Sequence, residues 1–240
     1  MIILHEDTIN EAELVAKDVE KHWGIKSRLI NENCDKLFRR IPHFSGDSYL
    51  VNKSSLESLR SDLDKKAFMV ITPRDLYNSD KSQNDDWVLG SQWGCASVVS
   101  LARMKTENGV PSNIFKINSE KYNKRVSLLC LHEIGHDLVS WENAPHLTCA
   151  YWVNASTGYK QVLGSHCLDN KCLMYEVVDI KTPSPEQGWL FFENPWDEGK
   201  GIGIKRFDAG IDDNANRLYP NLFCEKCAAS VKIPESYSEK

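Results

Sequence analysis

The stretch Val126-Ser-Leu-Leu-Cys-Leu-His132-Glu-Ile-Gly-His136 decides how the rest of the chain is interpreted. Its first half is apolar on nearly every side, which is typical of a helix buried in a protein core. We predict one long helix from Glu120 to about Trp141, bounded on its far side by Pro145. Residues four apart lie on one face of a helix, so His132 and His136 can bind one metal ion together.

Glu133 follows the first of these histidines directly. Zinc lowers the pKa of a coordinated water towards neutrality, and a carboxylate beside the first ligand can then act as the general base. A surface helix that happens to carry two histidines is the alternative. The apolar flanks argue against it, because buried ionisable groups are costly unless something satisfies them. We therefore predict a zinc ligand pair, His132 and His136, with Glu133 as the catalytic base.

The composition excludes several classes of partner. The 240 residues carry a formal net charge of −5, which argues against binding nucleic acid or an anionic membrane. No apolar stretch approaches the roughly eighteen residues that would span a bilayer. The N-terminus has no basic region and becomes acidic too early for a signal peptide. We expect a cytoplasmic protein, and no pattern in the sequence fixes its oligomeric state.

The residues before the long helix predict an α/β arrangement. We expect a helix at 9–23 between strands at 1–4 and 25–30, and a second helix at 54–63 capped by Ser54 or Ser55. A buried strand is expected at 67–72 and another strand at 95–101. Beyond residue 140 the chain becomes aromatic and loses its periodicity. We predict an upper subdomain at 1–140 and a lower one at 141–240, forming a single catalytic domain.

A catalytic zinc needs a third protein ligand and one open position. The compact pattern HExxHxxGxxH has a glycine seven residues after its first histidine. Here Val139 holds that position, and Glu142 holds the position of the expected ligand. The compact motif is therefore broken, and Glu142 could serve only if the helix ended before it without the glycine. The other downstream candidates are His146, His166 and the more remote Glu176.

Four of the eight cysteines pair by spacing, as Cys167-x4-Cys172 and Cys224-x2-Cys227. Four thiolates suffice for a closed tetrahedral zinc site, which has a structural role and no open position for chemistry. The alternatives are four buried thiols or two disulfides. A reducing compartment and the paired spacing disfavour both. We predict a structural zinc at these four cysteines.

The segment Gly164-Ser-His166-Cys167-Leu-Asp-Asn-Lys-Cys172-Leu-Met174, together with the later Cys-x2-Cys pair, resembles the archaemetzincin family of metallopeptidases. That family runs HExxHxxGxxH, a cysteine directly after the third histidine, Cys-x4-Cys-x-Met, and then Cys-x2-Cys. Every element except the glycine turn is present here in order. The resemblance implies that His166 is the third zinc ligand, in preference to His146. It also implies that Met174 is the methionine of the Met-turn beneath the site.

Two segments, 137–165 and 175–223, are longer than in the family, and we interpret both as insertions into loops. Their many aromatic residues either line a substrate pocket or build a small satellite core. Weaker matches to the family lie at 70–77, 87–90 and 95–103. By analogy, the strand at 95–101 is either an edge strand that binds an extended peptide or an ordinary core strand.

The expected fold is α/β and metzincin-like, with a twisted sheet, the active-site helix and an irregular C-terminal subdomain stapled by zinc. The resemblance implies hydrolysis of a peptide or protein substrate, with two zinc ions, one catalytic and one structural. Aminopeptidase and endopeptidase activity both stay open. One alternative is an inactive, zinc-stabilised module that binds peptide or protein. Another is a gluzincin-like site that uses Glu176 in place of His166.

Overall fold

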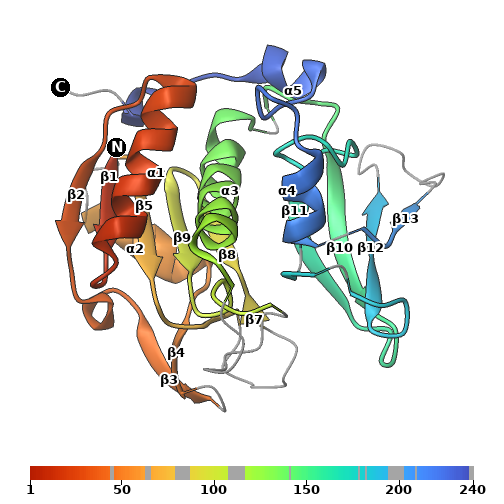
Figure 1. Ribbon diagram of the computed structural model, residues 1–240, viewed down its shortest axis with the longest axis horizontal. Helices are drawn as coiled ribbons and strands as arrows, with labels where there is room; N and C mark the ends of the chain where they lie inside the picture. Colours follow the sequence, from red (N-terminus) through yellow and green to blue (C-terminus); the bar gives the residue numbers. More distant parts are fainter. Residues whose placement is uncertain are drawn as a thin grey trace. The chain divides into compact units, whose positions relative to one another are not determined.

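The computed structural model of the chain describes residues 1–43, 46–62, 66–78, 87–107, 117–140, 142–177, 179–181, 183–193, 203–208 and 210–237 (Figure 1). The chain forms two compact units, each described by itself below. The first comprises Met1–Asp137 and Ile233–Lys240, and the second comprises Leu138–Lys232. Within the described ranges, no helix has the length and apolar character needed to cross a membrane.

A five-stranded sheet with the order β2-β1-β5-β9-β8 organises the first unit. Four of its strands are parallel, and β8 runs antiparallel to β9 at one edge. Every residue of β5 and β9 is buried, as expected for central strands that are covered on both faces. The strands are β1 (Ile2–His5), β2 (Arg28–Asn31), β5 (Phe68–Thr72), β8 (Gly90–Trp93) and β9 (Ala96–Ser100).

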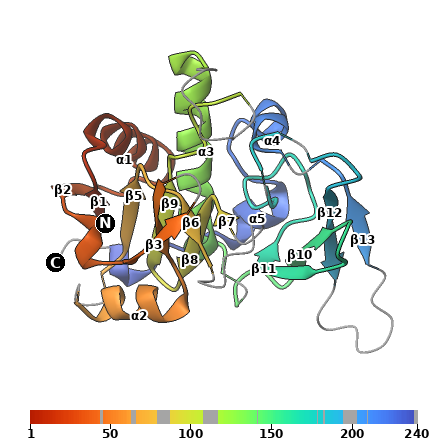
Figure 2. The ribbon, with the colours of Figure 1, turned by 90° about the horizontal axis from the view of Figure 1, so that it is seen from below.

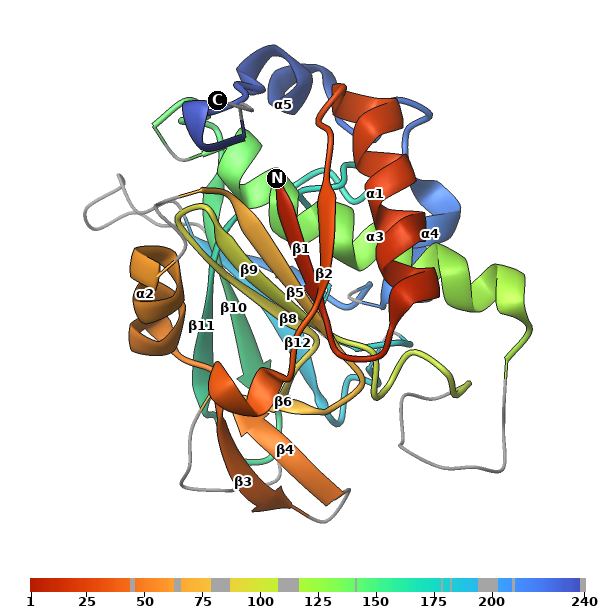
Figure 3. The ribbon, with the colours of Figure 1, turned by 90° about the vertical axis from the view of Figure 1, so that its left-hand side faces the viewer.

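Three helices cover this sheet, α1 (Ile9–Trp23), α2 (Lys53–Asp62) and α3 (Ser119–Leu138). Helices α1 and α3 lie on one face of the sheet and α2 lies on the other (Figures 2 and 3). Helix α1 ends at Gly24, whose φ of 67° is the left-handed conformation that glycine adopts readily. These elements confirm the predicted α/β class, the opening β-α-β unit and the long helix, which ends at Leu138 rather than near Trp141.

A smaller sheet with the order β3-β4-β6-β7 packs beside these elements. It consists of β3 (Arg39–His43), β4 (Gly46–Leu50), β6 (Leu76–Tyr77) and β7 (Trp87–Val88), and a short 3-10 turn, η1 (Cys34–Lys36), precedes it. One core cluster joins Tyr49 of β4 and Leu76 of β6 to Leu56 of α2 and Phe68 of β5. The two sheets of the first unit therefore share a hydrophobic core.

The structure decides between two alternatives for one strand of the first unit and corrects one predicted helix cap. The strand near 95–101 is a core strand, because β9 pairs with β5 on one side and β8 on the other. The edge position belongs to β8. The cap of α2 is Asn52, whose Oδ1 accepts the backbone N–H of Ser55 at 3.0 Å. The predicted serine caps are wrong by two or three residues, since a cap stands before the first helical residue.

The second unit contains more regular structure than an irregular subdomain. Its antiparallel sheet has the order β11-β10-β12-β13, built from β10 (Thr148–Asn154), β11 (Lys160–His166), β12 (Gly188–Glu193) and β13 (Ile204–Arg206). Helices α4 (Ile211–Arg217) and α5 (Glu225–Ser230) follow. Ala150, Tyr175, Leu190 and Phe192 form a buried cluster on this sheet. The aromatic residues of the long segments thus contribute to a satellite core.

The end of the chain belongs to the first unit. The N–H of Ala67, just before β5, donates to the carbonyl of Ser236 at 3.0 Å. Tyr237, in the 3-10 turn η2 (Glu235–Tyr237), is buried. The turn η2 is therefore fixed to the sheet of the first unit by a backbone hydrogen bond and a buried aromatic ring.

Candidate metal centres

His132 and His136 lie on the last turns of α3. Their Nε2 atoms are 3.2 Å apart, and the two rings are nearly perpendicular, at 87°. Two nitrogens held at about 2.0–2.1 Å by one tetrahedral zinc lie about 3.3 Å apart. The spacing of the two ring nitrogens therefore fits a shared zinc ion, as the i, i+4 pattern predicts.

The helix that carries this pair is fixed by apolar packing and by one buried cation. Val126, Leu129 and Ile134 are almost fully buried. Arg125, only 1% exposed, donates from Nη1 to the carbonyls of Met104 and Thr106, at 2.9 and 2.6 Å. Arg125 thereby ties the segment after β9 to α3, seven residues before the first histidine. Sequence spacing gave no signal for this role.

Glu133 is 6% exposed, and the edge strand β8 passes beside it. A Cβ added to Gly90 of β8 would lie 2.8 Å from Cδ of Glu133, closer than real Cβ atoms approach their neighbours. The absence of a side chain at position 90 therefore leaves room for the carboxylate. The stretch 87–90 resembles the family only weakly, and nothing in the sequence pattern pointed to a role for Gly90.

His166 is fully buried at the end of β11, in the second unit. Its Nε2 lies 2.5 Å from Oε2 of Glu176. Met174 is also fully buried, and its carbonyl accepts the N–H of Cys167 at 2.8 Å. The structure therefore gathers His166, Met174 and Glu176 in one neighbourhood. A carboxylate against a histidine ring is the usual arrangement of metal-binding histidines and their supporting residues.

Asp208 supports this neighbourhood and was not found from the sequence. Its carboxylate accepts hydrogen bonds from Asn170 and Tyr175, both at 2.6 Å, and from Arg217 at 2.9 Å. Burial raises the pKa of Asp208, but the hydrogen bonds from Tyr175 and Asn170 and the charge of Arg217 together lower it below the ordinary 3.8. Asp208 is therefore an anion that joins the loop after His166 to the residue after Met174.

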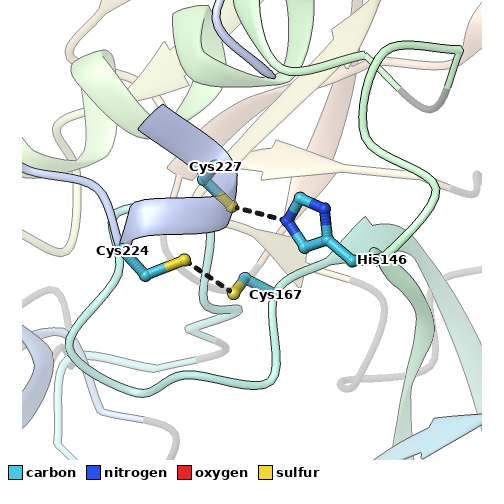
Figure 4. Close-up of side chains that lie close together, drawn as sticks. All are labelled: His146, Cys167, Cys224 and Cys227. Atoms are coloured by element: carbon cyan, nitrogen blue, oxygen red, sulfur yellow. Dashed lines mark hydrogen bonds between the residues drawn. The ribbon is translucent and has the colours of Figure 1, made fainter. Parts of the chain in front are cut away.

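The four paired cysteines come together in the second unit. Sγ of Cys167 and Sγ of Cys224 are 3.7 Å apart (Figure 4), and the N–H of Cys224 donates to Sγ of Cys172 at 3.4 Å. Hydrogen bonding, first from Cys172 and then from Cys227, lowers the pKa of Cys167 far below its usual range. All eight cysteines of the chain are free thiols, so the disulfide alternative is wrong. A cluster that favours a thiolate suits a soft metal ion such as zinc.

A fifth donor joins this cluster. His146, from the loop between α3 and β10, places its Nε2 3.2 Å from Sγ of Cys227 (Figure 4). The sequence analysis weighed His146 only as a ligand of the catalytic zinc. The structure places it with the cysteines instead. Glu142, the ligand position of the compact motif, is exposed in the turn after α3.

No family model matches the chain, and no curated protein matches it. Solved structures do resemble it. An archaemetzincin from Archaeoglobus fulgidus is 20% identical, with a TM-score of 0.48, over 96% of this chain and 100% of that one. An archaemetzincin from Methanopyrus kandleri is 16% identical, with a TM-score of 0.47, over 94% and 89%.

A zinc-dependent peptidase from Methanocorpusculum labreanum is 14% identical, with a TM-score of 0.49, over 97% of this chain and 100% of that one. All three neighbours are thus archaemetzincin or zinc-dependent peptidase structures.

Proposed function

We propose that this chain is a zinc metallopeptidase of the archaemetzincin type. The observation that carries the proposal is the pair of Nε2 atoms, 3.2 Å apart on a buried helix, with Glu133 next to the first of them. We propose that His132, His136 and His166 hold a catalytic zinc. A second, structural zinc belongs to the cysteine cluster.

We prefer His166 as the third ligand because of its burial and its contact with a carboxylate. It is buried, and the carboxylate of Glu176 at 2.5 Å can fix the orientation of its ring. The other histidine considered, His146, lies against Cys227. Glu142 is exposed to solvent. Glu176 is then the residue that orients His166, with Met174 as the Met-turn methionine.

The residues of the first unit supply the proton chemistry. When bound, a zinc ion makes water a better nucleophile near neutral pH and polarises the carbonyl of the scissile bond. Glu133 accepts the proton of the attacking water and passes it to the departing amine. Gly90 leaves the carboxylate the room for these transfers. Hydrolysis by this route needs no covalent intermediate with the chain.

The substrate is proposed to be a peptide that extends along β8. Strand β8 is last in the sheet order, and strands at sheet edges bind extended peptides through backbone hydrogen bonds. Gly90 lies in this strand and against Glu133, so a peptide on β8 would run past the catalytic base. The free thiols accord with a reducing compartment, and we propose a cytoplasmic location.

The structural zinc would be held in a closed site. Cys167, Cys224 and Cys227 supply three thiolates, and either Cys172, as the sequence predicts, or His146 fills the fourth position. Four protein ligands leave no position open for chemistry. The zinc would then fasten α5 to the loop that follows His166.

The competing proposal is an inactive module that binds peptides on the same scaffold. Quenched-fluorescence peptide libraries with zinc-loaded wild type, Glu133→Gln and the exposed control Glu142→Gln separate the two. A metallopeptidase loses about 10²–10⁴-fold in kcat on Glu133→Gln, the usual contribution of a general base. Its zinc content stays unchanged, and Glu142→Gln stays active. Equal cleavage by Glu133→Gln, or no cleavage by the zinc-loaded wild type, would overturn the proposal.

A further inference from the structure

The cysteine cluster offers more donors than a tetrahedral metal ion can use. Four cysteines and one histidine contribute side chains to it: Cys167, Cys172, Cys224, Cys227 and His146. A closed zinc site takes four ligands, so one of the five stays outside the coordination sphere. Cys167, Cys224 and Cys227 belong to both possible sets. The choice lies between Cys172 and His146.

The distances favour His146. The donor atoms of His146, Cys167, Cys224 and Cys227 all lie within 4.8 Å of one another, and these four form the candidate metal group. Around a tetrahedral zinc, two sulfurs are about 3.8 Å apart and a sulfur and a nitrogen about 3.6 Å apart. The observed Sγ–Sγ distance from Cys167 to Cys224 is 3.7 Å, and Nε2 of His146 is 3.2 Å from Sγ of Cys227. Both values are near those of a shared ion.

The side chains also converge from three directions (Figure 4). Cys227 lies in α5, with Cys224 directly before the helix. Cys167 follows β11, and His146 comes from the loop before β10. Figure 4 shows the ring of His146 directed at Cys227, across from the pair Cys167 and Cys224.

Cys172 has the contacts of a supporting residue. Its thiol is fully buried and accepts the N–H of Cys224 at 3.4 Å. Cys172 is absent from the group of four donor atoms that lie within 4.8 Å of one another. Groups that hydrogen-bond ligand atoms tune and orient them without binding the metal themselves.

We propose that His146 is a ligand of the structural metal, so that the site is His146, Cys167, Cys224 and Cys227, with Cys172 outside it as a hydrogen-bonding partner. This inference rests on the zinc-binding cluster of the proposed function, although not on peptidase activity. The metal would then tie the loop before β10 to α5 as well as to the segment after β11. The segment 137–165 would then be held by a metal ligand that lies eight residues after the end of α3.

Zinc affinity in the full-length chain tests the ligand set. Zinc content is measured after dialysis against graded chelator for wild type, His146→Ala, Cys172→Ser and Cys224→Ser. Removing a supporting residue costs about 10–100-fold in affinity, whereas removing a ligand costs more. We expect Cys172→Ser to keep the cluster zinc within that range, and His146→Ala and Cys224→Ser to weaken it by more than about 100-fold. The reverse order, with zinc lost in Cys172→Ser and kept in His146→Ala, would overturn the proposal.

A second test measures the absorption spectrum of cobalt(II) bound to the His132→Ala/His136→Ala variant. This test leaves the cysteine cluster unchanged, so it does not depend on whether the cluster variants fold. In that chain only the cluster is expected to hold metal. The proposal expects the spectrum of three thiolates and one nitrogen. A four-thiolate spectrum, or no bound cobalt, would contradict it. Neither result depends on hydrolysis, so an inactive wild type would overturn the proposed function and leave the ligand set standing.

Discussion

Gly90 of β8 lies so close to Glu133 of α3 that a methyl group at position 90 would come within 2.8 Å of the carboxyl carbon. The edge strand and the catalytic helix therefore meet at a residue without a side chain. Glu133 is only 6% exposed, so its carboxylate would have to shift within the protein interior. A side chain at position 90 would have to displace either the strand or the proposed base.

The change Gly90→Ala is expected to reduce kcat for peptide hydrolysis by about 10²-fold, since small displacements of a catalytic group have effects of this size. Zinc content should stay unchanged, because the added methyl group would lie against Glu133, which is not a zinc ligand in the proposed site. Ser91→Ala, at the next residue of β8, is the matched control and should keep wild-type activity. Full activity of Gly90→Ala would show that Glu133 tolerates displacement.

The second prediction concerns the contribution of Arg125 to the stability of the fold. Its buried guanidinium donates to two carbonyls in the segment after β9. Removing it leaves those acceptors without their partner, so Arg125→Met should lower the free energy of unfolding by about 3 kcal/mol. Urea denaturation measures the change. Lys124→Met, at an exposed position of the same helix, should change it by less than about 0.5 kcal/mol. Equal effects would argue against a structural role for Arg125.

The third prediction is that the hydrogen-bond network of Asp208 makes the free energy of unfolding depend on pH. Its pKa in the folded chain lies below the ordinary 3.8, so its network contributes stability above that value and loses it as the pH falls through the folded pKa. Asp208→Asn should cost about 2 kcal/mol at neutral pH. The difference from wild type should shrink below about pH 4. The exposed Asp213→Asn is the control. A difference that persists unchanged at pH 3 would contradict this role of the anion.

Much of the first unit could be predicted, because its signals are local. Apolar runs and helical spacing mark β5, α1 and α3, and Gly24 marks the end of α1. The sequence left open whether the strand at 95–101 lies at the edge or in the core of the sheet, because an apolar run alone does not identify a strand's neighbours. Strand β9 is completely buried, and the edge of the sheet is formed by β8, which is shorter and more polar.

The long segments of the second unit were harder to predict. Strand β12 alternates buried and half-buried residues, a period-two pattern that marks a half-buried strand. This pattern was hard to recognise in the sequence because aromatic residues occupy both faces of the strand. The contribution of His146 could not be predicted either. It lies 81 residues before its neighbour Cys227, so only tertiary folding brings the two together. Spacing rules find ligand pairs that are close in sequence, such as His132 and His136.

Glu176 distinguishes the two kinds of zinc site that the sequence leaves open. If it orients His166, Glu176→Gln should weaken the binding of one zinc by about 10–100-fold and leave the stoichiometry intact at high zinc. If Glu176 is itself the ligand, the same variant should lose that zinc, and His166→Ala should retain it. Chelator competition on both variants separates the outcomes. Asp179→Asn, nearby in the same unit, serves as the control.

The most direct test of the proposed metallopeptidase site is the number of zinc ions bound per chain in wild type and in His166→Ala, measured by elemental analysis after gel filtration. His22→Ala, on the outer helix α1, is the control and should match wild type. The proposal predicts two zinc ions in wild type and one in His166→Ala, with the cluster zinc retained. Two zinc ions in His166→Ala would contradict it.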